Sequence, residues 1–89
     1  MSNKDKTLFE FPCAFPLKVM GHDKAGFENH VRAIVARHVE ETEILDCTCR
    51  PSRNGNFLSV TVTIQAQSKQ QLDQLYIELN ASDAVLMTL

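Results

Sequence analysis

The sequence predicts an α+β fold in the order βαββαβ, a four-stranded antiparallel sheet covered on one face by two helices. Three observations predict it. Segments of alternating apolar residues indicate strands, apolar residues three and four apart indicate two helices, and an Asn-Gly pair joins two strands in a hairpin. Right-handed crossovers then put the first and third strands at the centre of the sheet. This plan is ferredoxin-like.

Composition and charge limit the function classes. The 89 residues, 44% apolar and 22% charged, predict one domain. We expect residues 1–14 to form a partly disordered N-terminal arm and residues 15–89 to form the domain. A net charge of −2 without a basic run argues against nucleic acid as a partner. No apolar stretch reaches the length of a signal peptide or membrane span, so we expect a cytoplasmic protein that does not bind membranes.

The first strand is predicted at residues 15–20, where apolar and polar side chains alternate. A helix follows over residues 23–38, with Asp23 as its N-cap. Its apolar positions recur at helical spacing and predict one buried stripe: Phe27, Val31, Ile34, Val35 and His38. Glu28 and Arg32, four residues apart, are expected on the opposite, solvated face.

The Asn54-Gly55 pair is the strongest hairpin signal, since a type I′ turn needs positive φ at both central positions. It joins predicted strands at residues 44–53 and 56–66. The register on one face pairs only apolar residues: Leu45 with Ile64, Cys47 with Val62, Cys49 with Val60 and Pro51 with Leu58. The other face pairs only polar residues: Asp46 with Thr63, Thr48 with Thr61 and Arg50 with Ser59. Because Pro51 cannot donate a ladder hydrogen bond, its strand belongs at a sheet edge.

The last part of the chain predicts a helix and a strand. Ser68 and Gln71 form a capping box, and apolar residues then recur at helical spacing as far as Asn80, which we expect to cap the C-terminus. Residues 84–89 are nearly all apolar and predict an edge strand without a blunting charge. Either the N-terminal arm or another molecule must cover that edge. We therefore expect a homodimer.

No group of residues indicates catalysis, a metal or a cofactor. No nucleophile, base and orienting group can be placed together, so we expect no catalytic residue. Cys13, Cys47 and Cys49 lack the spacing of a disulfide framework and are expected to be free thiols. We expect Cys47 and Cys49 to be buried packing residues and Cys13 to be exposed. The three histidines have neither metal-ligand spacing nor a catalytic partner: His22, His30 and His38.

A set of segments spread over nearly the whole chain resembles a known family. They are Phe11-Pro12, Phe15, Lys18-Val19-Met20-Gly21, Pro51-Ser52, Gly55-Asn56-Phe57 and Ser59-Val60-Thr61. These segments resemble the YbeD-like family of small uncharacterised bacterial proteins. The resemblance implies an ACT-like form of the ferredoxin-like fold, in a family sometimes labelled as lipoate-binding regulators. It carries over no catalytic residue.

A second, local resemblance involves Asp23-Lys24-Ala25-Gly26-Phe27. This segment is similar to the Asp-Arg-Pro-Gly-Leu pattern that opens the first helix of amino-acid-sensing ACT domains, although Lys24 and Ala25 replace Arg and Pro. In those domains the helix N-terminus and the glycine backbone face a small carboxylate ligand at a dimer interface. The resemblance implies a ligand site at six residues: Gly21, His22, Asp23, Lys24, Gly26 and Phe27.

These observations leave two hypotheses for function. The first is a non-enzymatic regulatory module of ACT-like type that senses a small carboxylate related to an amino acid or to lipoate. The alternative is an adaptor without a metabolite ligand that docks a partner protein through the polar open face of the sheet or through the C-terminal edge strand. The residues expected to contact a partner are Lys18, Arg50, Arg53, Val85 and Met87.

Overall fold

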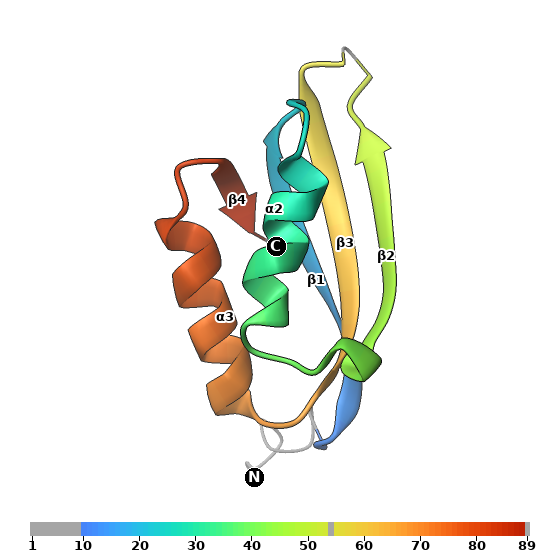
Figure 1. Ribbon diagram of the computed structural model, residues 1–89, viewed down its shortest axis with the longest axis vertical. Coiled ribbons are helices and arrows are strands. Elements are labelled where there is room, and N and C mark those ends of the chain that lie inside the picture. Colours follow the sequence, from blue (N-terminus) through green and yellow to red (C-terminus); the bar gives the residue numbers. More distant parts are fainter. Residues whose placement is uncertain (1–9, 54, 89) are drawn as a thin grey trace, which may run out of the picture.

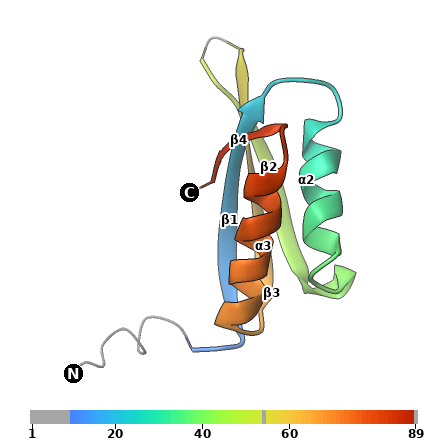
Figure 2. The same ribbon diagram turned by 90° about the vertical axis from the view of Figure 1, so that its left-hand side faces the viewer.

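A computed structural model describes residues 10–53 and 55–88. The elements in chain order are β1 (Cys13–His22), α2 (Phe27–Ala36), the 3₁₀ turn η1 (Glu41–Glu43), β2 (Ile44–Pro51), β3 (Phe57–Ala66), α3 (Lys69–Ala81) and β4 (Val85–Thr88). The strands form one antiparallel sheet in the order β2-β3-β1-β4. Both helices lie on the same face of that sheet (Figures 1 and 2). The predicted ferredoxin-like fold is confirmed, with β1 and β3 central.

β1 and β3 are the two central strands of the sheet, and they pair residue by residue from Cys13 with Ala66 to His22 with Phe57. β1 is longer than the predicted strand at both ends and includes the last two residues of the predicted arm. Residues 1–9 of that arm lie outside the described residues. Alternate side chains of the two strands point toward the helices and are fully buried, among them Leu17, Val60 and Val62. The core therefore fills the space between the two central strands and the helices.

α3 begins as the sequence predicts. The Ser68 hydroxyl accepts a hydrogen bond from the Gln71 backbone N–H at 3.1 Å, which satisfies one of the unpaired donors of the first turn. The Gln71 side chain does not close the capping box on Ser68. Instead its oxygen accepts from the Gln67 N–H at 2.8 Å, and its amide donates to the His38 carbonyl at 2.9 Å. The helix ends at Ala81, one residue beyond the predicted cap at Asn80.

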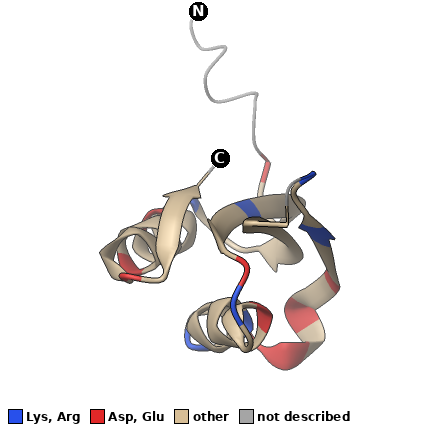
Figure 3. Ribbon diagram, turned by 90° about the horizontal axis from the view of Figure 1, so that it is seen from above, with Lys and Arg blue, Asp and Glu red and all other residues tan. Residues whose placement is uncertain are grey.

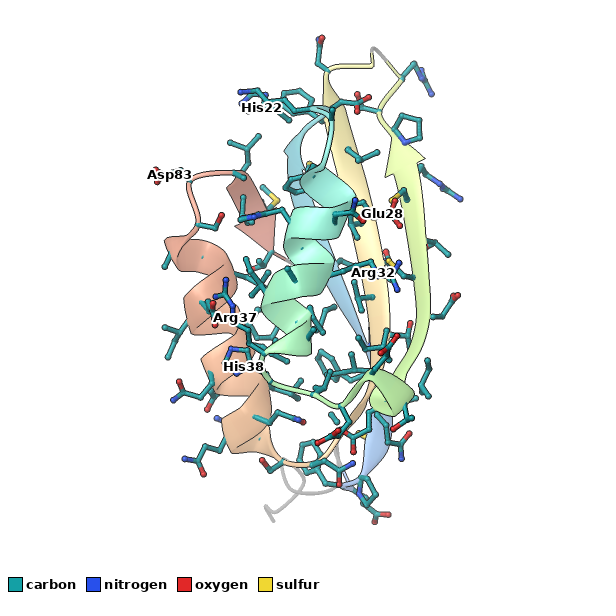
Figure 4. All side chains as sticks on the ribbon, in the orientation of Figure 1. His22, Glu28, Arg32, Arg37, His38 and Asp83 are labelled. Atoms are coloured by element: carbon teal, nitrogen blue, oxygen red, sulfur yellow. The ribbon has the colours of Figure 1, made fainter. Side chains whose placement is uncertain are left out.

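The N-cap of α2 lies three residues later than predicted, so the assignment of Asp23 as N-cap is wrong. Gly26 is the N-cap, in the left-handed region at φ 88°, which favours glycine. Asp23 directly follows β1, and its N–H donates to the Asn56 carbonyl at 3.0 Å. The helix ends at Ala36, before His38. The imidazole of His38 is half-buried and lies 2.6 Å from Glu78 on α3, which also pairs with Arg37 (Figure 4).

The hairpin register is confirmed for six of the seven predicted pairs, from Asp46 with Thr63 to Pro51 with Leu58. The seventh is wrong, because a register shift puts Ile44 opposite Ile64 and leaves Leu45 51% exposed. The loop is also longer than a two-residue turn. The Ser52 N–H donates to the Phe57 carbonyl at 2.8 Å, and the Phe57 N–H donates to the Ser52 hydroxyl at 3.1 Å. The Ser52 carbonyl accepts from the Gly55 N–H at 3.0 Å, while Asn54 lies outside the described residues. Gly55 has the positive φ, 76°, that the turn requires.

The inner face of β2 is less covered than predicted. Cys47 is half-buried, but Cys49 is exposed, so its predicted burial is wrong. The reason is the position of α2, which packs over β1 and β3 and leaves the edge strand open (Figure 1). Glu28 does not lie on a solvated face either. It turns toward β2, where the Cys47 thiol donates to its carboxylate at 3.5 Å (Figure 4).

A contact between three elements closes the top of the core. Gly21, near the end of β1, is buried under the ring of Phe27 and the backbone of Ala84. A methyl group at position 21 would lie 2.5 Å from the Ala84 carbonyl oxygen and 2.5 Å from two ring carbons of Phe27. No real side chain tolerates that approach, so the glycine is needed for the close packing of β1, α2 and the segment before β4.

We expect Gly21→Ala to lower the free energy of unfolding by about 1–3 kcal/mol, the usual cost of overpacking a closed site. Urea denaturation measures the change. Lys18→Ala, at an exposed position of the same strand, is the matched control and should stay within about 0.5 kcal/mol of the parent protein. A Gly21→Ala protein as stable as this control would contradict the packing.

We expect the Cys49 thiol to react slowly although it is exposed. Partial desolvation, a hydrogen bond to Glu28 and the charge of Glu28 raise the pKa of Cys49 from 9.0 to about 11. At pH 8 the thiolate is then about a hundredfold scarcer than in the unfolded chain, partly offset by its higher nucleophilicity, so alkylation should be roughly tenfold slower. Iodoacetamide labelling read by peptide mass spectrometry tests this.

Glu28→Gln should lower the pKa of Cys49 and speed its labelling. The substitution removes the negative charge that disfavours the thiolate, and it weakens the hydrogen bond that holds the thiol proton. Glu78→Gln, between the helices, is the control and should leave the rate unchanged. Labelling of Cys49 at the unfolded rate in the parent protein would contradict this account.

Candidate functional site

A hollow of about 210 Å³ lies at the end of the sheet where β1 leads into α2. It is lined by His22, Lys24, Ala25, Gly26, Phe27, His30, Asp83 and Ala84. These residues come from the end of β1, the turn after it, the start of α2 and the segment between α3 and β4. Figure 4 shows His22 and Asp83 at the same end of the molecule.

Four of the six predicted ligand residues line this hollow, namely His22, Lys24, Gly26 and Phe27. The other two do not. Gly21 lies buried beneath it, and Asp23 is exposed with its backbone paired to the hairpin loop.

Sequence reasoning missed the residues that the segment before β4 brings to the hollow, Asp83 and Ala84. It also missed His30, which lies one helical turn after Gly26 and lines the hollow. A topological signal for the first two was available. β4 pairs antiparallel with β1, so the segment that enters β4 must lie beside the segment that leaves β1.

Backbone hydrogen bonds hold the turn that forms the floor of the hollow. The Lys24 N–H donates to the His22 carbonyl at 2.8 Å, and the Phe27 N–H donates to the Lys24 carbonyl at 3.1 Å. The first helical bond follows, from the His30 N–H to the Gly26 carbonyl at 2.8 Å. This arrangement directs the N-terminal end of α2, with its partial positive charge, at the hollow.

Two imidazoles at the hollow are held in place by neighbours. The ring of His22 stacks on Phe57, with centroids 5.5 Å apart and an interplanar angle of 28°. His30 Nε2 lies 2.8 Å from the Ser82 hydroxyl. Lys24 makes no ion pair with any residue in 10–53 or 55–88. The residues that line the hollow thus include one lysine, two histidines, one aspartate and one phenylalanine.

The predicted partner residues are distributed over three places. Lys18 and Arg50 line a second hollow, of about 250 Å³, on the open face of the sheet. Arg53 is exposed in the hairpin loop. On β4, Met87 is 48% exposed, whereas Val85 is half-buried against the core.

The remaining chemistry of the described part of the chain is limited. No group of three or more His, Cys, Asp or Glu residues within it has the geometry of a metal site. Cys13 is half-buried opposite Ala66 rather than exposed, because it is the first residue of β1. None of the described helices has both the length and the apolar character needed to cross a membrane.

Solved structures share this fold at low sequence identity. The ACT domain from the GTP pyrophosphokinase of Chlorobium tepidum superposes with a TM-score of 0.69 at 16% identity, covering 86% of this chain and 83% of that one. Protein HP0495 from H. pylori superposes with a TM-score of 0.71 at 18% identity, covering 100% and 93%. The ACT-like form of the fold is therefore confirmed.

Sequence relatives extend over the whole chain. A UPF0250 protein of Chromobacterium violaceum is 40% identical over 89 residues, covering 100% of both chains. UPF0250 protein NE1487 of Nitrosomonas europaea is 42% identical over 85 residues, covering 96% of this chain and 98% of its own. The family model described as protein of unknown function (DUF493) matches residues 6–89. The YbeD-like resemblance is thereby confirmed, and the chain belongs to the DUF493 family.

Proposed function

We propose that this protein is a non-enzymatic regulatory module that senses a small carboxylate, with an amino acid as the preferred ligand class and lipoate as the second. The ligand would occupy the hollow between His22 and Ala84. The observation that carries the proposal is that Lys24, the N-terminus of α2 and Asp83 all line one hollow.

The charges of this hollow match the two ends of an amino acid. The Lys24 side chain and the helix N-terminus both favour a carboxylate. Asp83 offers an acceptor for an ammonium group from the opposite wall. Phe27, Ala25 and Ala84 provide an apolar surface for a side chain. A volume of about 210 Å³ equals about seven liquid-water volumes, which suits a ligand of this size.

A homodimer is part of the proposal, because the edge strand β4 stays uncovered within the described chain. Leu86 and Met87 are 50% and 48% exposed, and Ile77 on the adjacent helix is 62% exposed. An apolar edge of this kind favours pairing with another strand. A second copy paired there would also lie near Asp83 and Ala84, which directly precede β4.

Binding rather than catalysis is the role that these residues favour. His30 is engaged with Ser82, and His22 is stacked on Phe57. The Ser82 hydroxyl also accepts a hydrogen bond from the Ala84 N–H at 3.2 Å, so it stabilises the loop between α3 and β4. A nucleophile, a base and an orienting group aimed at one point are what an enzyme would need, and the described side chains of this hollow do not supply them.

Ligand-observed NMR and isothermal calorimetry against the amino acids and lipoate test the site. Gly26→Asp should weaken binding of a carboxylate roughly tenfold or more, since it adds a negative charge at the mouth of the hollow. Gly26→Asn is the matched control, because asparagine has the same shape, tolerates positive φ and carries no charge. Absence of binding by every compound, or equal affinity for the Asp and Asn variants, would refute the proposal.

The dimer has a separate test. Met87→Lys adds a charge to the exposed edge of β4 and should shift the protein toward monomer in sedimentation velocity experiments. Lys69→Glu, on the exposed surface of α3, is the control and should leave the sedimentation coefficient unchanged. A parent protein that sediments as a monomer at high micromolar concentration would refute this part of the proposal.

A further inference from the structure

The face of the sheet away from the helices carries a second hollow, built from three strands. It has a volume of about 250 Å³ and is lined by Lys18, Thr48, Arg50, Ser59 and Thr61. Lys18, Thr61 and Thr48 form one row across β1, β3 and β2. Ser59 and Arg50 form the next row. Figure 2 shows that both helices lie on the opposite side, so nothing in the described chain covers this face.

Two cations of this hollow have no ion-pair partner within residues 10–53 and 55–88. Lys18 and Arg50 make no ion pair with another described residue, and none of the five lining side chains is acidic. Asp46 is the nearest acid on this face by register, one row beyond Thr48, or about 7 Å along the strand. In a chain of net charge −2, this is a local concentration of positive charge (Figure 3).

We propose that this hollow binds the phosphate group of a small phosphate ester. The donor inventory points to this group. Arg50 offers a planar fork for two oxygens, Lys18 offers an ammonium group, and the three hydroxyls each offer one further donor. A phosphate monoester has three terminal oxygens and a charge close to −2 above pH 7, which matches both the donors and the two cations. A single carboxylate would leave one cation without compensation.

The strand spacing lets both cations reach one group. Lys18 and Arg50 lie on the two strands that flank β3 and one row apart, so their Cα atoms are about 12 Å from each other. Their long side chains can bend toward the middle, over Ser59 and Thr61. The hydroxyls form the floor, and the two charges close over it from opposite sides.

The extent of the positive charge favours a small ester over a polyanion. Nucleic acid needs a row of cations that follows many phosphates. Here Asp46 lies beyond the two cations along β2, and Met20, which pairs with Ser59 and Met87, lies beside them across the sheet. Toward the hairpin one further cation follows, the exposed Arg53. Three cations are too few for such a row. The site is separate from the hollow beside α2 and does not depend on the function proposed for that hollow.

Glycerol 3-phosphate is the probe, added at pH 7.5 and constant ionic strength to ¹⁵N-labelled full-length protein. We expect saturable amide shifts centred on Lys18, Thr48, Arg50, Ser59 and Thr61. Lys18→Gln and Arg50→Gln should each raise the Kd roughly threefold to fivefold, the range expected for exposed charges, and the double variant should lose saturable binding. Lys69→Gln, whose exposed cation pairs with Asp73 on α3, is the control and should bind like the parent protein.

Three results would overturn the proposal. The first is a shift pattern spread over all cations, including Lys69. The second is unchanged affinity in the Arg50→Gln or Lys18→Gln protein, both of which alter exposed side chains and keep the fold testable by the same spectra. The third is a different ligand preference. If glutarate binds as tightly as glycerol 3-phosphate, the hollow does not prefer phosphate. If a phosphoserine peptide binds much more tightly, the phosphate that the hollow recognises belongs to a protein rather than to a small ester.

Discussion

β3 pairs along its whole length with β1 and over most of its length with β2, and both faces of the sheet depend on this double register. Val60 and Val62 point toward the helices and are fully buried, whereas Ser59 and Thr61 point to the open face. A slip of one residue would exchange the two sets, burying hydroxyls without partners and exposing the core. Such a slip costs several buried side chains at about 1.5–3 kcal/mol each, so the register is strongly determined.

The hollow beside α2 depends on a second constraint, the contact at Gly21. Without a side chain there, the Phe27 ring and the Ala84 carbonyl approach the backbone of β1 closely. This contact brings the start of α2 and the entry to β4 to the same point, although these segments are more than fifty residues apart. The left-handed Gly26 then turns the chain so that the helix begins at the hollow. Two glycines with different physical roles thus build one site.

Alternation of residues predicted most of the sheet because burial on one face enforces it. The six pairs next to the hairpin follow from it, and Ser68 likewise predicted the start of α3. The predictions that failed concern residues whose surroundings are formed by segments distant in sequence, which a local pattern cannot reveal. α2 starts later than predicted because the Asp23 N–H pairs with the Asn56 carbonyl, next to the last residue pair of β1 and β3. Alternation assigned Cys49 to the inner face correctly, but it cannot tell whether a helix covers that part of the face.

The same distinction applies to the site. A resemblance over five adjacent residues implied that Lys24 and Gly26 belong to a ligand site, and both line the hollow. The opposite wall is contributed by Asp83 and Ala84, and its position follows only from the pairing of β4 with β1. Two residues of the open-face hollow, Lys18 and Arg50, were predicted as partner-binding residues on separate strands. The predicted register put Lys18 and Arg50 on the same open face, and the hollow between them follows from the assembled sheet.

A ligand beside α2 would act on the least restrained element of the sheet. β1 is held to β3 by ten residue pairs but to β4 by three, with an irregularity between Met20 and Gly21. The segment that enters β4 is tied to α2 through His30 and Ser82, directly at the hollow. A ligand that contacts Asp83 therefore changes the environment of β4 before it disturbs the central strands. β4 is also the apolar edge that no other described element covers. The proposed ligand and the proposed second copy would therefore contact the same element, and this shared contact would couple ligand binding to pairing.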